Sequence, residues 1–254
     1  MIRINNRYVT FQQLESQMML SVFQRDILRQ MINSQAVYSY SSAKELNFEL
    51  QMRENIIEAA KLLNNSDASF ATFRYSRGNP RYWLTESNGA LRLLPGIKPS
   101  DAINDIFVNG SEYGFECATG MVIVLYKAVM QSIGVERFNY LFRNLYLWAW
   151  QYDKDLSLNT TRRYDYFPGD ILYFDNPDVD PSTPQWQGEN VVYMGNGLYF
   201  GHGVGIKPKE GMIEELNSFR YPGSMRSAFL LEQATRPDYK RLYGYTLMYT
   251  PQYM

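Results

Sequence analysis

Apolar side chains recur at helical spacing through the N-terminal part of the chain. The stretch 10–31 opens with Thr10 and Gln13 in the arrangement of a capping box and then repeats apolar residues along one face. The stretch 42–64 opens in the same way at Ser42 and also keeps its apolar residues on one face. The pattern therefore predicts two helices, at 10–31 and 42–64.

Between residues 70 and 110 the apolar segments become short and are separated by turns. The pieces 70–73, 82–84 and 90–94 are typical of short strands, because each is apolar or aromatic and is bounded by turn residues. A short helix is expected at 101–108, with Ser100 in the position of its cap.

The most apolar segment, 121–126, follows Cys117 and has no polar face. A helix that is apolar on every side is usually buried, so we expect a central helix that begins near Cys117. An amphipathic segment rich in aromatic residues, 135–150, predicts a further helix.

After residue 168 the pattern favours strands. The segment 169–174 follows a turn, and 189–194 and 198–206 flank the Asn-Gly pair at 196–197, which is a strong hairpin signal. A last helix is expected at 224–234, followed by a Tyr-rich end that includes Tyr249 and Tyr253. With no repeat and no linker along its length, the chain is predicted to be one α+β domain.

Composition and charge exclude several classes of function. The 254-residue chain has a formal net charge of −1 and no block of like charge, which argues against nucleic acid or an anionic membrane as its main partner. No segment is apolar for long enough to span a membrane. Residues 1–7 lack the apolar core of a signal peptide, so we expect synthesis in the cytoplasm. A single cysteine excludes an internal disulfide and a cysteine-based metal site.

The Asp-rich loop at 175–180 resembles a calcium loop but fails its requirements. Counted from Asn176, the sixth and twelfth positions are Pro181 and Gln187, where an EF-hand needs Gly and Glu. The sequence also lacks a Gly-rich phosphate loop and a cluster of histidines. We therefore expect no metal and no cofactor.

Cys117 is the first candidate for chemistry. A thiol in the first turn of a helix lies at the positive end of the helix dipole, which favours the thiolate, the nucleophilic form. The alternative is structural, because a free cysteine is usually a small buried hydrophobe.

His202, the sole histidine, lies on the predicted hairpin. A two-residue turn would place Val191 opposite His202 and would make Glu189 its diagonal neighbour on an apolar face. An inward carboxylate without a basic partner is costly, which points to a function for Glu189. His202 could equally be a hydrogen-bonded core residue, and Glu116 a solvated charge that favours the helix start. Together these residues form a possible cysteine-nucleophile site.

Six stretches, spread over most of the chain, resemble one known family. They are Phe-Ala-Thr-Phe at 70–73, Phe-Glu-Cys-Ala-Thr at 115–119, Gly-Asp-Ile-Leu-Tyr-Phe at 169–174, Gln-Trp-Gln-Gly-Glu-Asn-Val at 185–191, Tyr-Phe-Gly-His-Gly at 199–203 and Leu-Asn-Ser-Phe-Arg at 216–220. In this order they resemble the small protein-glutamine gamma-glutamyltransferases (transglutaminases) of spore-forming bacteria, which are associated with the spore coat.

The resemblance implies a papain-like core, in which a central helix bearing the cysteine packs on an antiparallel sheet. It implies Cys117 as the nucleophile and Glu189 as its main acidic partner. Glu116 matches a position thought able to replace Glu189 in part, and His202 matches the family's histidine near the site.

The resemblance also implies a hydrophobic passage around the cysteine, to which Phe70, Trp150 and Trp186 correspond; from the sequence alone these aromatics could equally be core. We expect a mainly helical extension at 1–110, a catalytic core at 111–236 and a tail at 237–254.

The implied activity is calcium-independent cross-linking of glutamine- and lysine-bearing spore coat proteins. The implied enzyme is a monomer made in the mother cell and placed on the coat surface. One alternative is a cysteine hydrolase, such as a cell-wall peptidase or amidase, with the same core. Another is a coat protein without catalytic activity, which the many tyrosines would suit.

Overall fold

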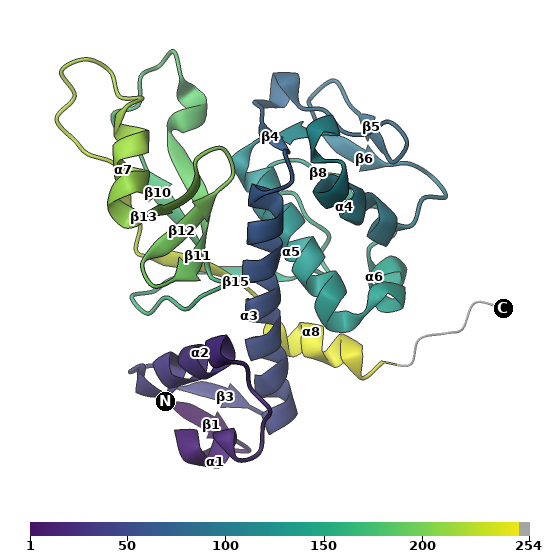
Figure 1. The fold of residues 1–254 in the computed structure, drawn as a ribbon, viewed down its shortest axis with the longest axis vertical. Helices are drawn as coiled ribbons and strands as arrows, with labels where there is room; N and C mark the ends of the chain where they lie inside the picture. Colours follow the sequence, from purple (N-terminus) through teal and green to yellow (C-terminus); the bar gives the residue numbers. More distant parts are fainter. Residues whose placement is uncertain (249–254) are drawn as a thin grey trace.

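Helix α3, Ala43–Asn64, runs through the middle of the molecule and contacts elements on all sides (Figure 1). The computed structural model describes residues 1–248, so Tyr249 and Tyr253 of the expected tail lie outside the described residues. Ser42 caps α3 by accepting a hydrogen bond from the backbone N–H of Glu45, as the sequence predicts. The helix ends at Asn65, within the predicted turn.

The N-terminal part contains a small sheet as well as helices. Its order is β2 (Arg7–Tyr8), β1 (Ile2–Ile4) and β3 (Tyr38–Tyr40). The predicted single helix at 10–31 is wrong, because two helices occupy this stretch, α1 (Phe11–Glu15) and α2 (Val22–Asn33). The physical reason is a second capping box at Ser21 and Gln24, which starts a new helix after a break.

Short strands form at all three places expected between residues 70 and 94, but the first covers only Phe70 of the predicted 70–73, since a 3-10 turn follows at Phe73–Tyr75. They are β4 (Ser69–Phe70), β5 (Trp83–Thr85) and β6 (Leu91–Leu93). Helix α4 (Pro99–Val108) confirms the next helix, but Lys98 and not Ser100 occupies its N-cap. Strand β7 (Gly114–Phe115) pairs with β4 and leads directly into the central helix.

The central helix is confirmed as α5, Cys117–Ile133, and fourteen of its residues are buried. The helix predicted at 135–150 is wrong beyond its first two turns. Helix α6 (Val135–Leu141) ends early, and the chain then forms β8 (Tyr146–Leu147), which pairs with β6. Residues 146–147 form a strand because they pair with the edge of β6, although the local apolar spacing favours a helix.

The C-terminal half forms a seven-stranded sheet. Its main path runs in the order β13 (Gly205–Pro208), β12 (Leu198–Gly201), β11 (Gly188–Gly195), β10 (Ile171–Asp175), β15 (Gln233–Pro237) and β9 (Leu158–Arg162), and β14 (Phe229–Leu230) pairs with β10. The helix expected at 224–234 is therefore wrong, since β14 and the start of β15 occupy it.

Two helical layers cover this sheet. One face packs against α3 and α5 through residues such as Val192 and Phe200. The other packs against α7 (Lys209–Asn217) through Val191 and Leu216. The last described helix, α8 (Tyr239–Thr246), contacts α3 and α5. A central helix that starts with the cysteine and packs on an antiparallel sheet is the arrangement of a papain-like core.

The hairpin of β11 and β12 has a different register from the expected one. Gly195 pairs with Leu198 as predicted, but a bulge follows and Tyr193 pairs with Tyr199 instead of Phe200. As a result Val191 faces Gly201, and His202 lies beyond the end of β12. The inference that Glu189 and His202 are diagonal neighbours on one ladder does not hold.

None of the helices within residues 1–248 has the length and apolar character that crossing a bilayer requires.

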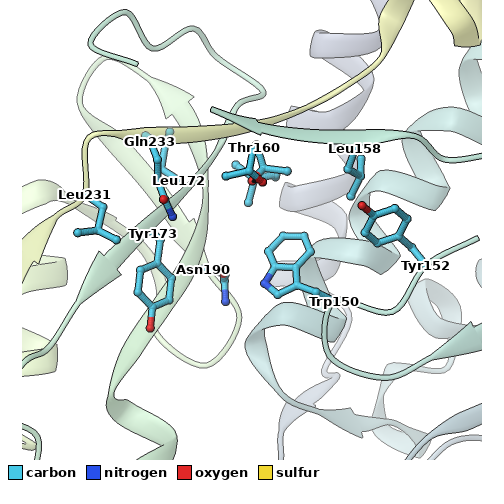
Figure 2. A pocket seen from close by; sticks show the side chains of 11 residues that line it. Trp150, Tyr152, Leu158, Thr160, Leu172, Tyr173, Asn190, Leu231 and Gln233 are labelled. Atoms are coloured by element: carbon cyan, nitrogen blue, oxygen red, sulfur yellow. Dashed lines mark hydrogen bonds between the residues drawn. The ribbon is translucent and has the colours of Figure 1, made fainter. Parts of the chain in front are cut away.

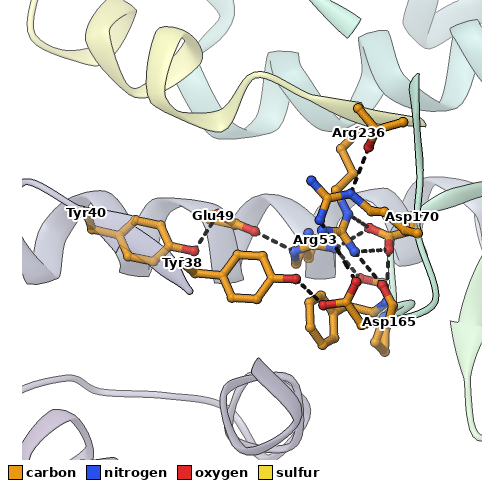
Figure 3. A network of polar contacts seen from close by, with 11 residues as sticks. Tyr38, Tyr40, Glu49, Arg53, Asp165, Asp170 and Arg236 are labelled. Carbon is orange, nitrogen blue, oxygen red and sulfur yellow. Dashed lines mark hydrogen bonds and ion pairs between the residues drawn. The ribbon is translucent and has the colours of Figure 1, made fainter. Parts of the chain in front are cut away.

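A buried ion-pair network joins α3 to the large sheet (Figure 3). Asp170, fully buried, accepts hydrogen bonds from Arg53 at 2.8 Å and from Arg236 at 2.7 Å. Arg53 also pairs with Glu49 at 2.9 Å, and Glu49 accepts a hydrogen bond from Tyr40 at 2.8 Å. Burial opposes ionisation of Asp170, but the two guanidinium groups hold its pKa below the usual value.

We expect Asp170→Asn to lower the free energy of unfolding by about 3–5 kcal/mol, because it leaves two buried guanidinium groups without their shared carboxylate. Urea denaturation followed by circular dichroism measures this loss. Glu58→Gln is the matched control: it breaks the exposed pair of Glu58 with Lys61 and should cost less than about 1 kcal/mol. Equal losses in the free energy of unfolding for the two variants would show that the buried network stabilises the fold no more than an exposed ion pair does.

Candidate active site

Cys117 is the first residue of α5, and Glu116 is the N-cap of that helix. The Glu116 carboxylate accepts hydrogen bonds from the backbone N–H groups of Ala118 and Thr119, both at 2.9 Å. Its second role is contact with the thiol, since the Cys117 Sγ lies 3.5 Å from Glu116 Oε2. Glu116 is therefore both a helix cap and a neighbour of the sulfur, rather than a solvated charge.

Asn190, on β11, is a site residue that the sequence reasoning missed. Its Nδ2 donates a hydrogen bond to Cys117 Sγ at 3.4 Å, and its backbone N–H also favours the thiolate. The only available signal was its place beside Glu189 in a motif that matches the family. Side-chain direction along β11 could not be inferred without the correct register.

Glu189 is fully buried next to Cys117. Neither of its carboxyl oxygens accepts a well-formed hydrogen bond from residues 1–248. The carboxyl packs against Gly201, where a Cβ atom would approach Glu189 Oε1 to 2.6 Å, so a larger residue at 201 would displace it. Burial, together with the charge of Glu116, raises the pKa of Glu189 well above its usual value.

The Cys117 thiol is less acidic than its position at a helix start suggests. Burial and the charges of Glu189 and Glu116 raise its pKa well above the usual value, while hydrogen bonds from Asn190 act in the opposite direction. The physical reason is that the first free N–H groups of α5 point at Glu116 and not at the sulfur. Burial and the two neighbouring carboxyl groups therefore act against the acidic thiol that the helix start predicts.

His202 lies against the first turn of α5, next to Gly120. Its ring stacks on Phe115 with centroids 4.5 Å apart, and its Nε2 lies 3.2 Å from the carbonyl oxygen of Ser69. Gly120 permits this packing, because a Cβ there would approach His202 to 2.9 Å. Burial lowers the pKa of His202 to about 4, so the ring is neutral near pH 7.

The three aromatic candidates fall into two groups. Phe70 stacks on Trp186 with centroids 5.0 Å apart, and Trp186 in turn stacks on Phe219 at 4.4 Å. Trp150 instead lines a cavity of about 450 Å³ together with Asn190 (Figure 2). Asn190, which lines this cavity, also donates a hydrogen bond to the Cys117 sulfur, so the cavity and the thiol lie on either side of one residue.

The Asp-rich loop uses its oxygens on protein groups. Asp178 accepts hydrogen bonds from Arg226 and from the backbone N–H of Met225, and Asp180 accepts from Ser182. Across residues 1–248, no group of three or more His, Cys, Asp or Glu side chains is arranged to hold a metal ion.

The chain was compared with known proteins at the level of family, sequence and structure. A model of the family described as "Protein-glutamine gamma-glutamyltransferase" matches residues 1–246. Proteins of that name are 47% identical in Bacillus cereus, over 98% of this chain and 87% of the relative, and 46% identical in Halalkalibacterium halodurans, over 88% and 78%.

A solved transglutaminase from Geobacillus stearothermophilus, without its C-terminal extension, is similar in structure. It aligns with a TM-score of 0.78 and 48% identity, over 80% of this chain and 98% of that one. Matches of this extent and identity, together with a buried thiol between two carboxyl groups, lead to one conclusion. The chain belongs to the protein-glutamine gamma-glutamyltransferase family of acyltransferases, the transglutaminases.

Proposed function

We propose that Cys117 carries the transglutaminase reaction of this chain, with Glu189 as its acid–base partner. The observation that supports this most directly is the buried carboxyl of Glu189, which lies beside the thiol without a cation to neutralise it. A perturbed carboxyl next to a nucleophile is typical of an active site. Burial raises the pKa values of both groups, as expected for two titratable side chains that share one enclosed site.

The first half of the reaction forms a thioester. In its ionised form, the Glu189 carboxylate accepts the proton of Cys117 Sγ as the sulfur bonds to the γ-carbon of a substrate glutamine. The carbon–nitrogen bond of the carboxamide then breaks, and Glu189 returns the proton to the leaving nitrogen, which departs as ammonia.

The second half transfers the acyl group to an amine. Glu189 accepts a proton from a lysine ε-amine as its nitrogen attacks the thioester carbonyl. The carbon–sulfur bond breaks, the isopeptide bond remains, and the proton returns to Cys117 Sγ. Glu116 lies 3.5 Å from the sulfur and can replace Glu189 in part.

The oxyanion of each step needs a hydrogen-bond donor. The N–H groups of Ala118 and Thr119 are unsuitable, because they already donate to Glu116. The side-chain amide of Asn190 points at the sulfur and is placed to donate to an oxygen on the carbon that the sulfur attacks. We assign His202 a positioning role, since its ring packs the first turn of α5 against Phe115.

Transfer to an amine requires that water be kept from the thioester. The aromatic residues Phe70, Trp150 and Trp186 would exclude it and admit two extended side chains. The stacking of Phe70 on Trp186 and the place of Trp150 beside Asn190 support this role. The same enclosure favours transfer over the hydrolysis expected of a cell-wall peptidase or amidase.

Calcium independence is part of the proposal. The carboxylates of the Asp-rich loop already bind Arg226, Ser182 and backbone N–H groups, which leaves them poorly suited as calcium ligands.

The first prediction concerns incorporation of monodansylcadaverine into a glutamine-rich protein, measured in EDTA. Cys117→Ala should abolish it, and Glu189→Gln should lower the rate by roughly 10²–10⁴, because proton transfer is lost. Glu116→Gln should cost less, since the amide oxygen of Gln can still cap α5. Glu58→Gln, which changes an exposed residue of α3 that pairs with Lys61, serves as the control.

Two results would contradict this assignment. Full incorporation by Cys117→Ala would identify a protein without cysteine catalysis, and ammonia release without amine attachment would identify a hydrolase. Loss of activity in EDTA that calcium restores would refute calcium independence. Slow alkylation of Cys117 below pH 7 would not distinguish an enzyme from a protein without catalytic activity. The raised pKa of the thiol predicts slow alkylation in both cases.

The second prediction tests whether His202 is buried in its neutral form, as its packing against α5 requires. The folded-state pKa is about 4 and the unfolded value about 6.5, so the unfolded chain binds more protons between these pH values. Stability should therefore fall as the pH is lowered from about 6.5 to about 4, by on the order of 3 kcal/mol from this residue. Urea denaturation across this range should show a shallower decline for His202→Gln. Parallel declines in both proteins would exclude a buried neutral histidine.

The third prediction concerns location. We propose that the chain is a monomer made in the mother cell, and that it cross-links glutamine- and lysine-bearing proteins on the spore coat surface. The support is the resemblance of its motifs to spore-coat enzymes. Spores carrying Cys117→Ala should contain less γ-glutamyl-lysine in hydrolysed coat extracts than spores with the unmodified chain. An unchanged amount, or antibody detection in the cytosolic fraction alone, would refute this location.

A further inference from the structure

The cavity beside Trp150 is not explained by the positions of the catalytic groups. It occupies about 450 Å³ between the loop that carries Trp150 and strands β9, β10 and β15 (Figure 2). We propose that this cavity binds the glutamine-bearing segment of the acyl donor, and that the lysine-bearing segment reaches the thioester without entering it. The proposal rests on the thioester mechanism given above.

The cavity is connected to the nucleophile through Asn190. This residue lines the cavity, and its Nδ2 lies 3.4 Å from Cys117 Sγ. Tyr173 gives a second connection, since it also lines the cavity and pairs with Asn190 across β10 and β11. A side chain that enters the cavity and passes Asn190 therefore arrives at the sulfur.

The chemistry of the walls favours a carboxamide. The eleven residues that line the cavity are all uncharged. Thr160 and Thr235 share a hydrogen bond of 2.6 Å across β9 and β15, so the pair presents a hydroxyl group to the cavity. Gln233 and Asn190 add amide donors and acceptors. A primary carboxamide both donates and accepts hydrogen bonds, and these groups can satisfy both.

The same walls disfavour a lysine ammonium group. Moving a charged amine out of water is costly unless a carboxylate accompanies it, and none lies in the lining. The charged residues next to the lining positions, Arg162 and Glu232, bind each other at 2.7 Å and are not free to pair with a substrate cation. The volume lies within the range of ordinary ligand sites and suits a glutamine side chain with part of its flanking peptide.

Strand β9 offers a matched pair of variants to test the proposal. Thr160 lines this cavity, whereas the adjacent Thr161 lines the separate pocket that includes Arg163 and Arg236. Both threonines are exposed on the same edge strand. Thr160→Trp should fill the cavity, and Thr161→Trp should place the same bulk outside it.

The measurement is initial rates with a glutamine-containing peptide and cadaverine, both varied. In a reaction through a covalent intermediate, kcat/KM for each substrate reports its own half-reaction. For Thr160→Trp we expect kcat/KM for the peptide to fall by roughly tenfold or more, because even one misfitting methylene in a substrate pocket costs roughly 10–200-fold. The value of kcat/KM for cadaverine should stay within about twofold. Thr161→Trp should change neither constant.

Three outcomes would overturn the proposal. A fall in kcat/KM for cadaverine alone would assign the cavity to the amine, and no fall in either constant would exclude a substrate site. Equal falls in both, if the smaller change Thr160→Val also produces them, would show a general effect on the fold. Failure of the proposed transfer to an amine would look different: the unmodified chain would release ammonia without attaching cadaverine. The peptide constant could then still be measured from ammonia release and would test the cavity by itself.

Discussion

The structure depends on one buried carboxylate held between two arginines. Asp170 precedes β10, Arg53 lies in α3 and Arg236 lies in β15. A single set of ion pairs therefore joins α3 to the middle of the large sheet. Arg53 extends the network to Glu49 and Tyr40, which belongs to the N-terminal sheet. Because α3 packs on α5 and β10 pairs with β11, the network also sets the distance between Cys117 and the strand that faces it.

The same molecule contains a second buried carboxyl with the opposite behaviour. Asp170 and Glu189 are equally inaccessible to water, but Asp170 contacts two guanidinium groups and Glu189 contacts none. The pKa of Asp170 is lowered and that of Glu189 is raised, although burial acts in the same direction on both. The paired carboxylate stabilises the fold, whereas the unpaired carboxyl lies beside the Cys117 thiol, where burial favours its neutral form.

At the start of α5, Glu116 decides which hydrogen bonds are available to the neighbouring Cys117. Glu116 takes the free N–H groups of the first turn, so the helix end stabilises this carboxylate and not the thiolate of Cys117. Hydrogen bonds to the sulfur then come from Asn190 on β11. The surroundings of the Cys117 sulfur consequently depend on the packing of the sheet against α5, because this hydrogen bond joins the two.

The sequence by itself determined those features that arise from local hydrogen bonding and from regular spacing of apolar residues. The cap at Ser42, the helix that starts at Cys117 and the strands around 171–175 and 188–195 are of this kind, and six short motifs sufficed to identify the family. Tertiary structure alone decided the elements with distant partners. Strand β8 forms because β6 offers an edge, and the segment predicted as a helix at 224–234 forms strands because β10 and β9 pair with it.

The site divides in the same way. The sequence pointed to Cys117 as a lone thiol at a helix start with Glu116 beside it, and to Glu189 through an expected inward strand position and a family motif. It could not show the bulge that moves His202 off the ladder, the amide that Asn190 directs at the sulfur, or the raised pKa of the thiol. These properties depend on strand register and on burial, and both are set by contacts between residues far apart in the chain.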